Sequence, residues 1–229
     1  MNFDIVIIGS GPGGYVAAIR ASQLGMKVAV VEKSEVGGIC LNYGCIPTKA
    51  LLKSASVYQT TKDAKKYGIG VDNIGFDFEK IIARSRQVAN QMSKGVSFLF
   101  QKNNITLVQG YGKLIDNQTI EIDNNGEKTQ ITGKHIIIAT GAKSRQFPNL
   151  QIDGTKIIGY HQALTMTKQP ESMLVVGSGA IGTELAFFYA TLGTKVTIVE
   201  LLDRVIPLED NEVSAEVESA LKKLRVKVL

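Results

Sequence analysis

The two cysteines of the chain lie five residues apart, in the segment Gly37–Lys49 that reads Gly-Gly-Ile-Cys-Leu-Asn-Tyr-Gly-Cys-Ile-Pro-Thr-Lys. A disulfide needs its two Cα atoms within about 7 Å, and a regular helix would hold Cys40 and Cys45 too far apart. A bridge between them therefore requires a local distortion, for which Gly44 supplies a permissive backbone. Such a bridge closes a small loop and constrains little of the unfolded chain, so its value would lie in being cleaved.

Two simpler interpretations of the cysteine pair remain open. The cysteines could be buried and inert, or they could bind a metal ion. The chain has no third cysteine, and His135 and His161 lie far away without ligand spacing, so we expect no metal site. Because the pair follows a nucleotide-binding pattern, described next, we favour an electron relay to a bound flavin.

A repeat at an offset of 168 residues relates the start of the chain to its last third. Each copy begins with an apolar run, Ile5–Ile8 or Leu174–Val176, and then turns on glycines into an alanine-rich segment typical of a helix. A second apolar run follows in each copy and ends on a glutamate, Glu32 or Glu200. The three glycines that recur are Gly9, Gly11 and Gly14 in the first copy and Gly177, Gly179 and Gly182 in the second.

This glycine pattern has a specific physical meaning in each copy. The first glycine permits a tight turn, the second lets a pyrophosphate approach the backbone, and the third lets helix and strand pack closely. The helix N-terminus then offers N–H groups and a positive dipole end to phosphates. The terminal glutamate can accept hydrogen bonds from ribose hydroxyls and repels a 2′-phosphate, so Glu200 favours NAD over NADP. The sequence therefore predicts two dinucleotide sites.

The segments between the two copies predict one long helix and an antiparallel meander. Residues 76–104 show helical spacing, with a stripe expected to face the core: Ile81, Val88, Met92, Val96 and Leu99. Residues 105–132 alternate apolar and polar side chains and turn at Asn124-Asn125-Gly126, which indicates a hairpin. Lys134–Gly141 is predicted as a buried strand that returns the chain to a parallel sheet, and Ala142–Pro170 links it to the second copy. The expected fold is α/β with two Rossmann-like units, three-layered with a β-meander in the first and incomplete in the second.

The composition excludes several classes of protein. The chain has 229 residues, a net charge of +5, 44% hydrophobic residues and 23 glycines, which is neither a disordered nor a fibrous composition. Its basic residues group beside acidic or apolar ones, so we expect solvated helix faces and no nucleic-acid partner. The apolar window Met173–Gly193 contains four glycines and a strand-turn-helix rhythm, which argues against a membrane span. Without a basic targeting segment at the N-terminus, we expect a cytoplasmic protein with no membrane partner.

Five segments resemble motifs of the pyridine-nucleotide–disulfide oxidoreductases, and the resemblance covers the whole chain. The Cys-x4-Cys motif is highly specific to that family. Cys-Leu-Asn with Ile-Pro-Thr-Lys is similar to the branch that acts on dihydrolipoamide, whereas glutathione and mercuric reductases usually read Cys-Val-Asn and prefer NADP. Tyr43 replaces a valine common in the family, from which we expect little consequence. The segments are residues 9–14 (Gly-Ser-Gly-Pro-Gly-Gly), 37–49, 139–141 (Ala-Thr-Gly), 177–182 (Gly-Ser-Gly-Ala-Ile-Gly) and 204–210 (Arg-Val-Ile-Pro-Leu-Glu-Asp).

The resemblance implies that FAD binds the first unit and NAD the second. Residues 1–145 would form an FAD-binding domain with a redox-active disulfide, and residues 146–229 the first part of an NAD-binding domain. The residues that it assigns to FAD are Gly9, Ser10, Gly11, Pro12, Gly14, Glu32, Lys33, Gly38, Cys40, Lys49, Gly112, Thr140 and Gly141. The residues that it assigns to NAD are Gly177, Ser178, Gly179, Ala180, Ile181, Gly182 and Glu200.

The resemblance further implies NAD-dependent oxidation of dihydrolipoamide. Cys40 would exchange with the substrate, and Cys45 would lie next to the flavin and donate charge to it as a thiolate. Lys49, one helical turn after Cys45, would reach the flavin N5 region and pair with Glu184. A buried cap near a helix start is the alternative for Glu184. The alternative functions are a non-catalytic FAD- and NAD-binding fragment, or a related disulfide or mercuric reductase.

Partners also follow from the resemblance. They are the lipoyl domain of a 2-oxoacid dehydrogenase complex, or of the glycine cleavage system, and a second copy in a full-length homodimer. The family's interface domain carries a His–Glu base pair, and neither His135 nor His161 lies in a matching motif. The last residues, Val226–Leu229, resemble the opening of a third strand. We therefore expect the chain to be a portion of a longer enzyme, without the interface domain.

Overall fold

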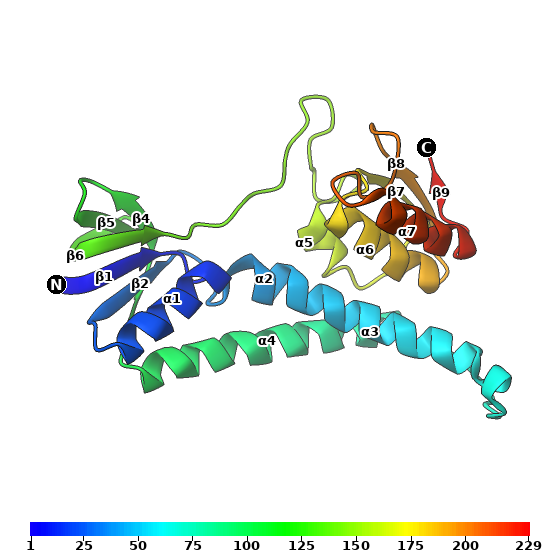
Figure 1. Ribbon diagram of the computed structural model, residues 1–229, viewed down its shortest axis with the longest axis horizontal. Coiled ribbons are helices and arrows are strands. Elements are labelled where there is room, and N and C mark those ends of the chain that lie inside the picture. Colours follow the sequence, from blue (N-terminus) through cyan, green and yellow to red (C-terminus); the bar gives the residue numbers. More distant parts are fainter. The chain divides into compact units, whose positions relative to one another are not determined.

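Residues Met1–Leu229 are all described by a computed structural model, in which they form two units (Figure 1). The first unit comprises residues 1–47 and 86–151, and the second comprises residues 48–85 and 152–229. The change of unit near residue 151 lies close to the predicted boundary at 145. Residues 48–85, however, group with the second unit.

A six-stranded sheet is the centre of the first unit, with the strand order β3-β2-β1-β6-β5-β4. The strands β1 (Asn2–Ile8), β2 (Val28–Glu32) and β3 (Thr106–Gln109) are parallel, with helix α1 (Pro12–Gln23) as the crossover between β1 and β2. This is the β-α-β unit predicted from the first glycine motif. The strand β6 (Glu127–Ile138) pairs in parallel with β1 along most of its length.

The predicted meander is confirmed as β4 (Tyr111–Leu114), β5 (Thr119–Asn124) and the beginning of β6. Its second turn is the predicted hairpin, because Asn124 pairs with Glu127 across a two-residue loop. The loop residues Asn125 and Gly126 have φ angles of 55° and 94°, as a type I′ turn requires.

Two apolar clusters lie on opposite faces of the parallel strands. Ile7, Val28 and Val30 face the helices, where they pack with residues of α1 and of α4 (Phe78–Lys102). The alternate residues of the same strands face the meander, whose Ile120, Ile122 and Ile131 cover them. The three predicted layers are therefore helices, parallel sheet and meander.

Two details of the first unit differ from the sequence predictions. Ile138 is 66% exposed and the strand before it is only half-buried, so the buried strand predicted at 134–141 is wrong in its burial. On α4, Met92 and Leu99 are exposed. The buried positions of α4 lie on a neighbouring face that includes two small side chains, Ser85 and Ala89. They are Phe78, Ile82, Ser85, Ala89, Val96 and Phe100.

The second unit repeats the strand-helix-strand pattern. The parallel strands β7 (Ser172–Val176), β8 (Lys195–Val199) and β9 (Lys227–Val228) are connected by α6 (Ala180–Thr191) and α7 (Asn211–Lys223). The third strand predicted at the last residues is confirmed as β9. The remaining elements of the chain are α2 (Gly38–Tyr43), α3 (Cys45–Lys62), the 3-10 helix η1 (Ala64–Tyr67) and α5 (Tyr160–Ala163).

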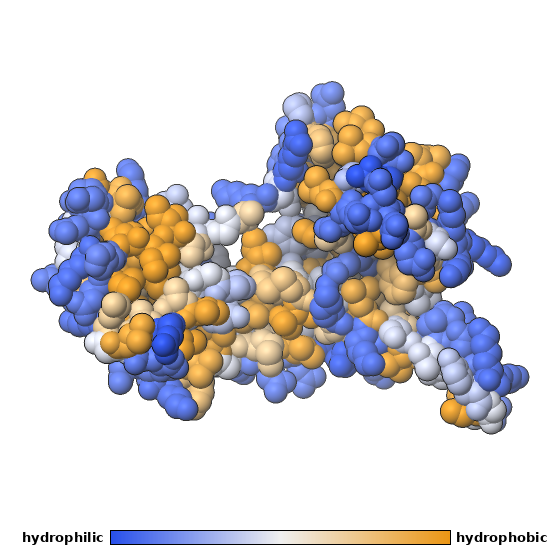
Figure 2. Space-filling model, in the orientation of Figure 1, coloured by the Kyte–Doolittle hydropathy of each residue, from blue (hydrophilic) through white to orange (hydrophobic).

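One face of this smaller sheet is apolar and uncovered. Leu174 and Val176 are 63% and 49% exposed, whereas Val6 and Ile8, which occupy the same places in the repeat, are buried under the meander of the first unit. Figure 2 shows hydrophobic residues at several places on the surface of the molecule. None of the helices is long and apolar enough to cross a membrane.

Candidate functional site

The first glycine loop connects β1 to α1. Gly9 has a φ of +102°, and its N–H donates to the carbonyl oxygen of Val31 at 2.8 Å. A Cβ on Gly14 would lie 1.9 Å from the carbonyl oxygen of Gly9, which leaves no room for any side chain there. Gly11 caps α1 with extended backbone, and no atom lies within 4 Å of where its Cβ would be. The turn and close-packing roles of the outer glycines are confirmed, and the middle glycine opens onto free space.

The second glycine loop, between β7 and α6, repeats this geometry. Gly177 has a φ of +94° and donates its N–H to the carbonyl oxygen of Val199 at 2.8 Å. A Cβ on Gly182 would lie 2.3 Å from the carbonyl oxygen of Gly177, while the Cβ position of Gly179 is open. The two loops therefore share one backbone arrangement, as the repeat predicts.

A serine-to-glutamate contact closes each loop. The Ser10 N–H and hydroxyl donate to Oε2 of Glu32 at 2.9 and 2.6 Å. The Ser178 N–H and hydroxyl donate to Oε2 of Glu200 at 2.7 Å each. Both serines are fully buried. The glycine motifs contain these serines but do not reveal their bonds to the glutamates, although both pairs recur at the same offset of 168 residues.

A further backbone contact supports each serine, and no motif in the sequence indicates it. The Gly37 N–H donates to the carbonyl oxygen of Ser10 at 3.1 Å, and the Ile206 N–H donates to that of Ser178 at 3.0 Å. Ile206 has a φ of +42° and belongs to the 204–210 motif, in which Arg204 donates to the carbonyl oxygen of Pro207 at 2.9 Å. The 204–210 motif therefore stabilises the second glycine loop through the hydrogen bond from Ile206 to Ser178.

Hydrogen bonding keeps Glu200 ionised. The Ser178 hydroxyl and N–H, followed by the N–H groups of Leu202 and Leu201, lower the pKa of the Glu200 carboxyl from 4.5 to about 2. The two N–H groups of residues 201 and 202 donate to Oε1 at 2.8 and 3.1 Å. Glu200 is therefore a carboxylate at neutral pH.

This lowered pKa predicts a pH-dependent contribution to stability. A carboxyl with a depressed pKa in the folded state stabilises fully above its ordinary pKa and loses that contribution as the pH falls through the folded value. For Glu200 the loss falls between about pH 4.5 and pH 2. We expect Glu200→Gln to be less stable than the parent near neutral pH, with the difference shrinking over that range in urea unfolding. A difference that stays constant with pH would contradict the assignment.

The cysteine segment contains the predicted distortion. Helix α2 ends at Tyr43, Gly44 adopts φ −142° and ψ −120°, and α3 begins at Cys45. A Cβ on Gly44 would lie 3.0 Å from the carbonyl oxygen of Ile39, so the break brings backbone unusually close. Both cysteines are thiols in this structure, Cys40 half-buried and Cys45 exposed.

Side chains around α2 hold this break in place. The Asn42 amide donates to the carbonyl oxygens of Val36 and Gly38, each at 3.0 Å. Arg86 donates to the carbonyl oxygen of Asn42, and its guanidinium lies 4.7 Å from the centre of the Tyr43 ring. Burial, followed by nearby Glu35, raises the pKa of the Tyr43 hydroxyl. Tyr43 thus takes part in the packing of the thiol segment, so the expectation that its replacement of valine has little consequence does not hold for packing.

The predicted pairing of Lys49 and Glu184 is confirmed as an ion pair between α3 and α6, both in the second unit. The Lys49 side chain is 60% exposed and that of Glu184 is 33% exposed. Such an exposed pair adds little to stability. Their proposed roles at the flavin stay predictions.

The other predicted FAD residues lie around the first loop or at its edges. Gly38 has a φ of +60°, and its Cβ would lie 2.8 Å from the Cα of Gly11. Gly112, on β4, packs closely against Val31 and Ile8, which accounts for its lack of a side chain through packing alone. The remaining residues are Pro12 in the first turn of α1, Lys33 with its ammonium 5.8 Å from the Tyr111 ring centre, and Thr140-Gly141 just after β6. On the NAD side, Ala180 and Ile181 open α6.

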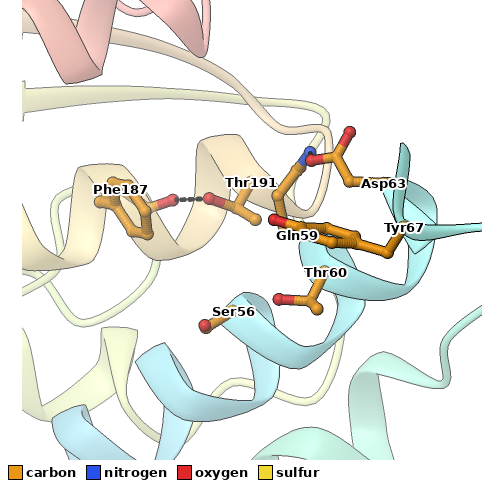
Figure 3. Close-up of a pocket in the computed structure, with 7 residues that line it drawn as sticks. All are labelled: Ser56, Gln59, Thr60, Asp63, Tyr67, Phe187 and Thr191. Carbon is orange, nitrogen blue, oxygen red and sulfur yellow. Dashed lines mark hydrogen bonds between the residues drawn. The ribbon is translucent and has the colours of Figure 1, made fainter. Parts of the chain in front are cut away.

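A small pocket lined mostly by polar residue types lies elsewhere in the second unit, between α3, η1 and α6 (Figure 3). It has a volume of about 180 Å³. Its internal hydrogen bonds run from Thr191 to the carbonyl oxygen of Phe187 and from Gln59 to Asp63. None of the predicted site residues lines it, so it does not belong to the nucleotide or thiol sites. The lining residues are Ser56, Gln59, Thr60, Asp63, Tyr67, Phe187 and Thr191.

Known proteins resemble this chain closely in sequence. It is 50% identical over 229 residues to a dihydrolipoyl dehydrogenase of Zymomonas mobilis, covering 100% of this chain and 49% of the relative. It is 43% identical over 231 residues to a dihydrolipoyl dehydrogenase of Bacillus subtilis, covering 97% of this chain and 49% of the relative. The chain thus spans about half the length of the curated relatives that it matches.

Solved structures and a family match agree with this likeness. LpdA from Mycobacterium tuberculosis superposes with a TM-score of 0.89 at 27% identity, over 98% of this chain and 50% of its own. The HOCl-induced flavoprotein disulfide reductase RclA from Escherichia coli gives 0.82 at 28% identity, over 99% of this chain and 48% of its own. Residues 3–229 match the family described as "Pyridine nucleotide-disulphide oxidoreductase". The chain therefore belongs to the pyridine nucleotide-disulphide oxidoreductase family.

Proposed function

We propose that this protein is a flavin-dependent disulfide oxidoreductase that oxidises dihydrolipoamide and reduces NAD. The observation that carries the proposal is the doubled nucleotide loop, together with two thiols at a helix break. Relatives that are 43–50% identical over nearly the whole chain bear the name dihydrolipoyl dehydrogenase, which supports the choice of substrate.

The first loop suits FAD. The open space at Gly11 and the N-terminus of α1 could receive a pyrophosphate, and Glu32 stands at the end of β2 to accept ribose hydroxyls. The second loop offers the same features at Gly179, α6 and Glu200, and we assign NAD to it. Residues 1–145 would accordingly serve as the FAD-binding domain with the redox pair, and residues 146–229 as part of the NAD-binding domain.

The selection of NAD over NADP rests on Glu200. Its carboxylate is ionised at neutral pH and would repel a 2′-phosphate. The two side chains that follow it, Leu201 and Leu202, are apolar and exposed, and they offer no cation to bind such a phosphate.

The chemistry that the protein's own residues perform is thiol–disulfide exchange. A substrate thiolate attacks Sγ of Cys40 in the Cys40–Cys45 disulfide, the S–S bond breaks, and Cys45 leaves as a thiolate. The second substrate thiol then attacks the substrate sulfur of this mixed disulfide and releases Cys40. The substrate closes its ring as lipoamide, and its two electrons remain in the cysteine dithiol.

The other predicted groups have supporting roles in this proposal. Bound FAD would supply the two-electron relay between the cysteine dithiol and NAD. Lys49, oriented by its ion pair with Glu184, would present its positive charge to the flavin. The lipoyl domain of a 2-oxoacid dehydrogenase complex or of the glycine cleavage system would deliver the substrate, and the full-length enzyme would be a homodimer.

An anaerobic titration tests this function. The FAD-reconstituted chain is reduced with dihydrolipoamide or, as a matched control, with a monothiol at equal thiol concentration. We expect only the dithiol to give a long-wavelength charge-transfer band, because ring closure drives the exchange forward, and we expect added NAD to remove the band as NADH forms. A flavoprotein that dihydrolipoamide does not reduce would contradict the proposed substrate. A chain that retains no flavin would contradict FAD binding by these residues.

A further inference from the structure

The carboxylate of Glu200 is fully occupied by donors of the protein itself. Its Oε2 accepts from the Ser178 N–H and hydroxyl, and its Oε1 accepts from the N–H groups of Leu201 and Leu202. An ionised carboxylate has about four acceptor positions. Each of them is therefore filled before any ribose arrives, and a ribose hydroxyl can bind Glu200 only by replacing one of these donors.

Only one of the four donors can leave without a change of backbone. Three are main-chain N–H groups held by the β7–α6 loop and by the turn after β8, whereas the Ser178 hydroxyl hydrogen can turn away about its C–O bond. No group of this loop donates a hydrogen bond to the hydroxyl oxygen Oγ of Ser178. This oxygen is therefore also able to accept a hydrogen bond from an incoming hydroxyl.

The first loop provides a comparison, because the hydroxyl of its serine both donates and accepts a hydrogen bond within the protein. The Ser10 oxygen accepts from the Gly37 N–H at 3.2 Å while its hydroxyl donates to Glu32. Glu32 accepts three hydrogen bonds, from the N–H and hydroxyl of Ser10 and from the N–H of Ser34, and so keeps one position open for a ribose hydroxyl. Ser10 can therefore stay in place when a ribose binds, whereas Ser178 cannot.

We propose that the Ser178 hydroxyl is an exchangeable placeholder at Glu200, displaced by a hydroxyl of the adenosine ribose when the nucleotide binds. This inference rests on the proposed NAD site and adds a residue that tunes it. Without nucleotide, Ser178 satisfies the carboxylate. When the nucleotide binds, the ribose hydroxyl donates to Oε2 in place of the Ser178 hydroxyl. The loss of the Ser178 hydrogen bond reduces the binding free energy that the ribose hydroxyl contributes.

Nucleotide binding to the FAD-saturated chain tests the proposal, because FAD then blocks the first loop. Isothermal titration calorimetry gives the dissociation constants of ADP and of 2′,3′-dideoxy-ADP. The dissociation constant of dideoxy-ADP divided by that of ADP measures the contribution of the ribose hydroxyls to binding. We expect Ser178→Ala to raise this ratio about 3- to 10-fold, the range of one net hydrogen bond, because the competitor is gone. Ser178→Gly removes the same hydroxyl and serves if the alanine variant fails to fold.

Ser56→Ala is the control, because it deletes a hydroxyl of the second unit that lines the separate pocket and should leave the ratio unchanged. A ratio that stays the same in both Ser178 variants would overturn the placeholder role. A ratio that falls toward one would show instead that the hydroxyl supports ribose binding, which also overturns it. If the parent chain binds neither nucleotide, the proposed NAD site itself is refuted, and the inference falls with it.

Discussion

Replacing Gly14 by alanine is expected to lower the free energy of unfolding by about 3 kcal/mol and to abolish FAD retention. The added Cβ would lie 1.9 Å from the carbonyl oxygen of Gly9. Neither atom can retreat, because the Gly9 N–H is tied to the carbonyl oxygen of Val31 and the loop joins a central strand to its helix. Helix α1 must therefore move away from the sheet. Urea unfolding and the ratio of flavin to protein after purification measure the two effects.

Gly11→Ala is the matched control for this prediction. Its Cβ meets nothing within 4 Å, and the φ of −67° at Gly11 suits any residue. We expect a cost of no more than about 1 kcal/mol to the fold, since alanine caps a helix less well than glycine. Flavin retention should still fall, because the new methyl group occupies the space proposed for the pyrophosphate. Equal stability of the Gly14 variant and the parent would contradict the close-packing argument. Undiminished flavin in the Gly11 variant would contradict the proposed binding mode.

The second large effect is expected from substituting either cysteine by serine. The two substitutions should change the charge-transfer band in different ways. Cys45→Ser should remove the charge-transfer band that dithiol reduction produces, because the thiol proposed to lie beside the flavin is gone. Cys40→Ser should keep a band, because the thiol proposed to donate charge to the flavin is still present. Both variants should lose dihydrolipoamide oxidation down to the background, since neither can form the disulfide. Visible spectra under anaerobic conditions and single-turnover NADH formation measure these outcomes.

Each cysteine variant is the control for the other. They change one sulfur to oxygen at sites on either side of the Gly44 break, so any general effect on folding should be shared. A band that survives in Cys45→Ser and disappears in Cys40→Ser would exchange the two assigned roles. Bands lost in both variants would contradict a single charge-donating thiol.

Much of the fold follows from local sequence patterns with a strong physical cause. The two β-α-β units are predicted at residues 4–32 and 174–200, because alternating apolar runs and glycine turns are compatible with few other structures, and the structure places them at 2–32 and 172–199. The hairpin at Asn125-Gly126 was predicted because few residues adopt two consecutive positive φ angles. The helix break between the cysteines was likewise predicted from Gly44.

Predictions of burial were weaker, because burial depends on what covers a side chain. The stripe on α4 was placed on its larger apolar residues, yet Ser85 and Ala89 are buried while Met92 is exposed. Leu174 and Val6 occupy the same place in the repeat and are both apolar, but only Val6 has a meander over it. No local pattern carries that information.

By itself, the sequence determined the two nucleotide loops, the thiol pair and the family resemblance, since each rests on residue types at fixed short spacings. The tertiary structure decided how the groups are held: the bonds of Ser10 and Ser178 to their glutamates, the support of the second loop by Ile206, and the ion pair of Lys49 with Glu184. These contacts join residues between 22 and 135 positions apart. Their existence depends on strand register and helix packing, so only the folded chain brings the partners together.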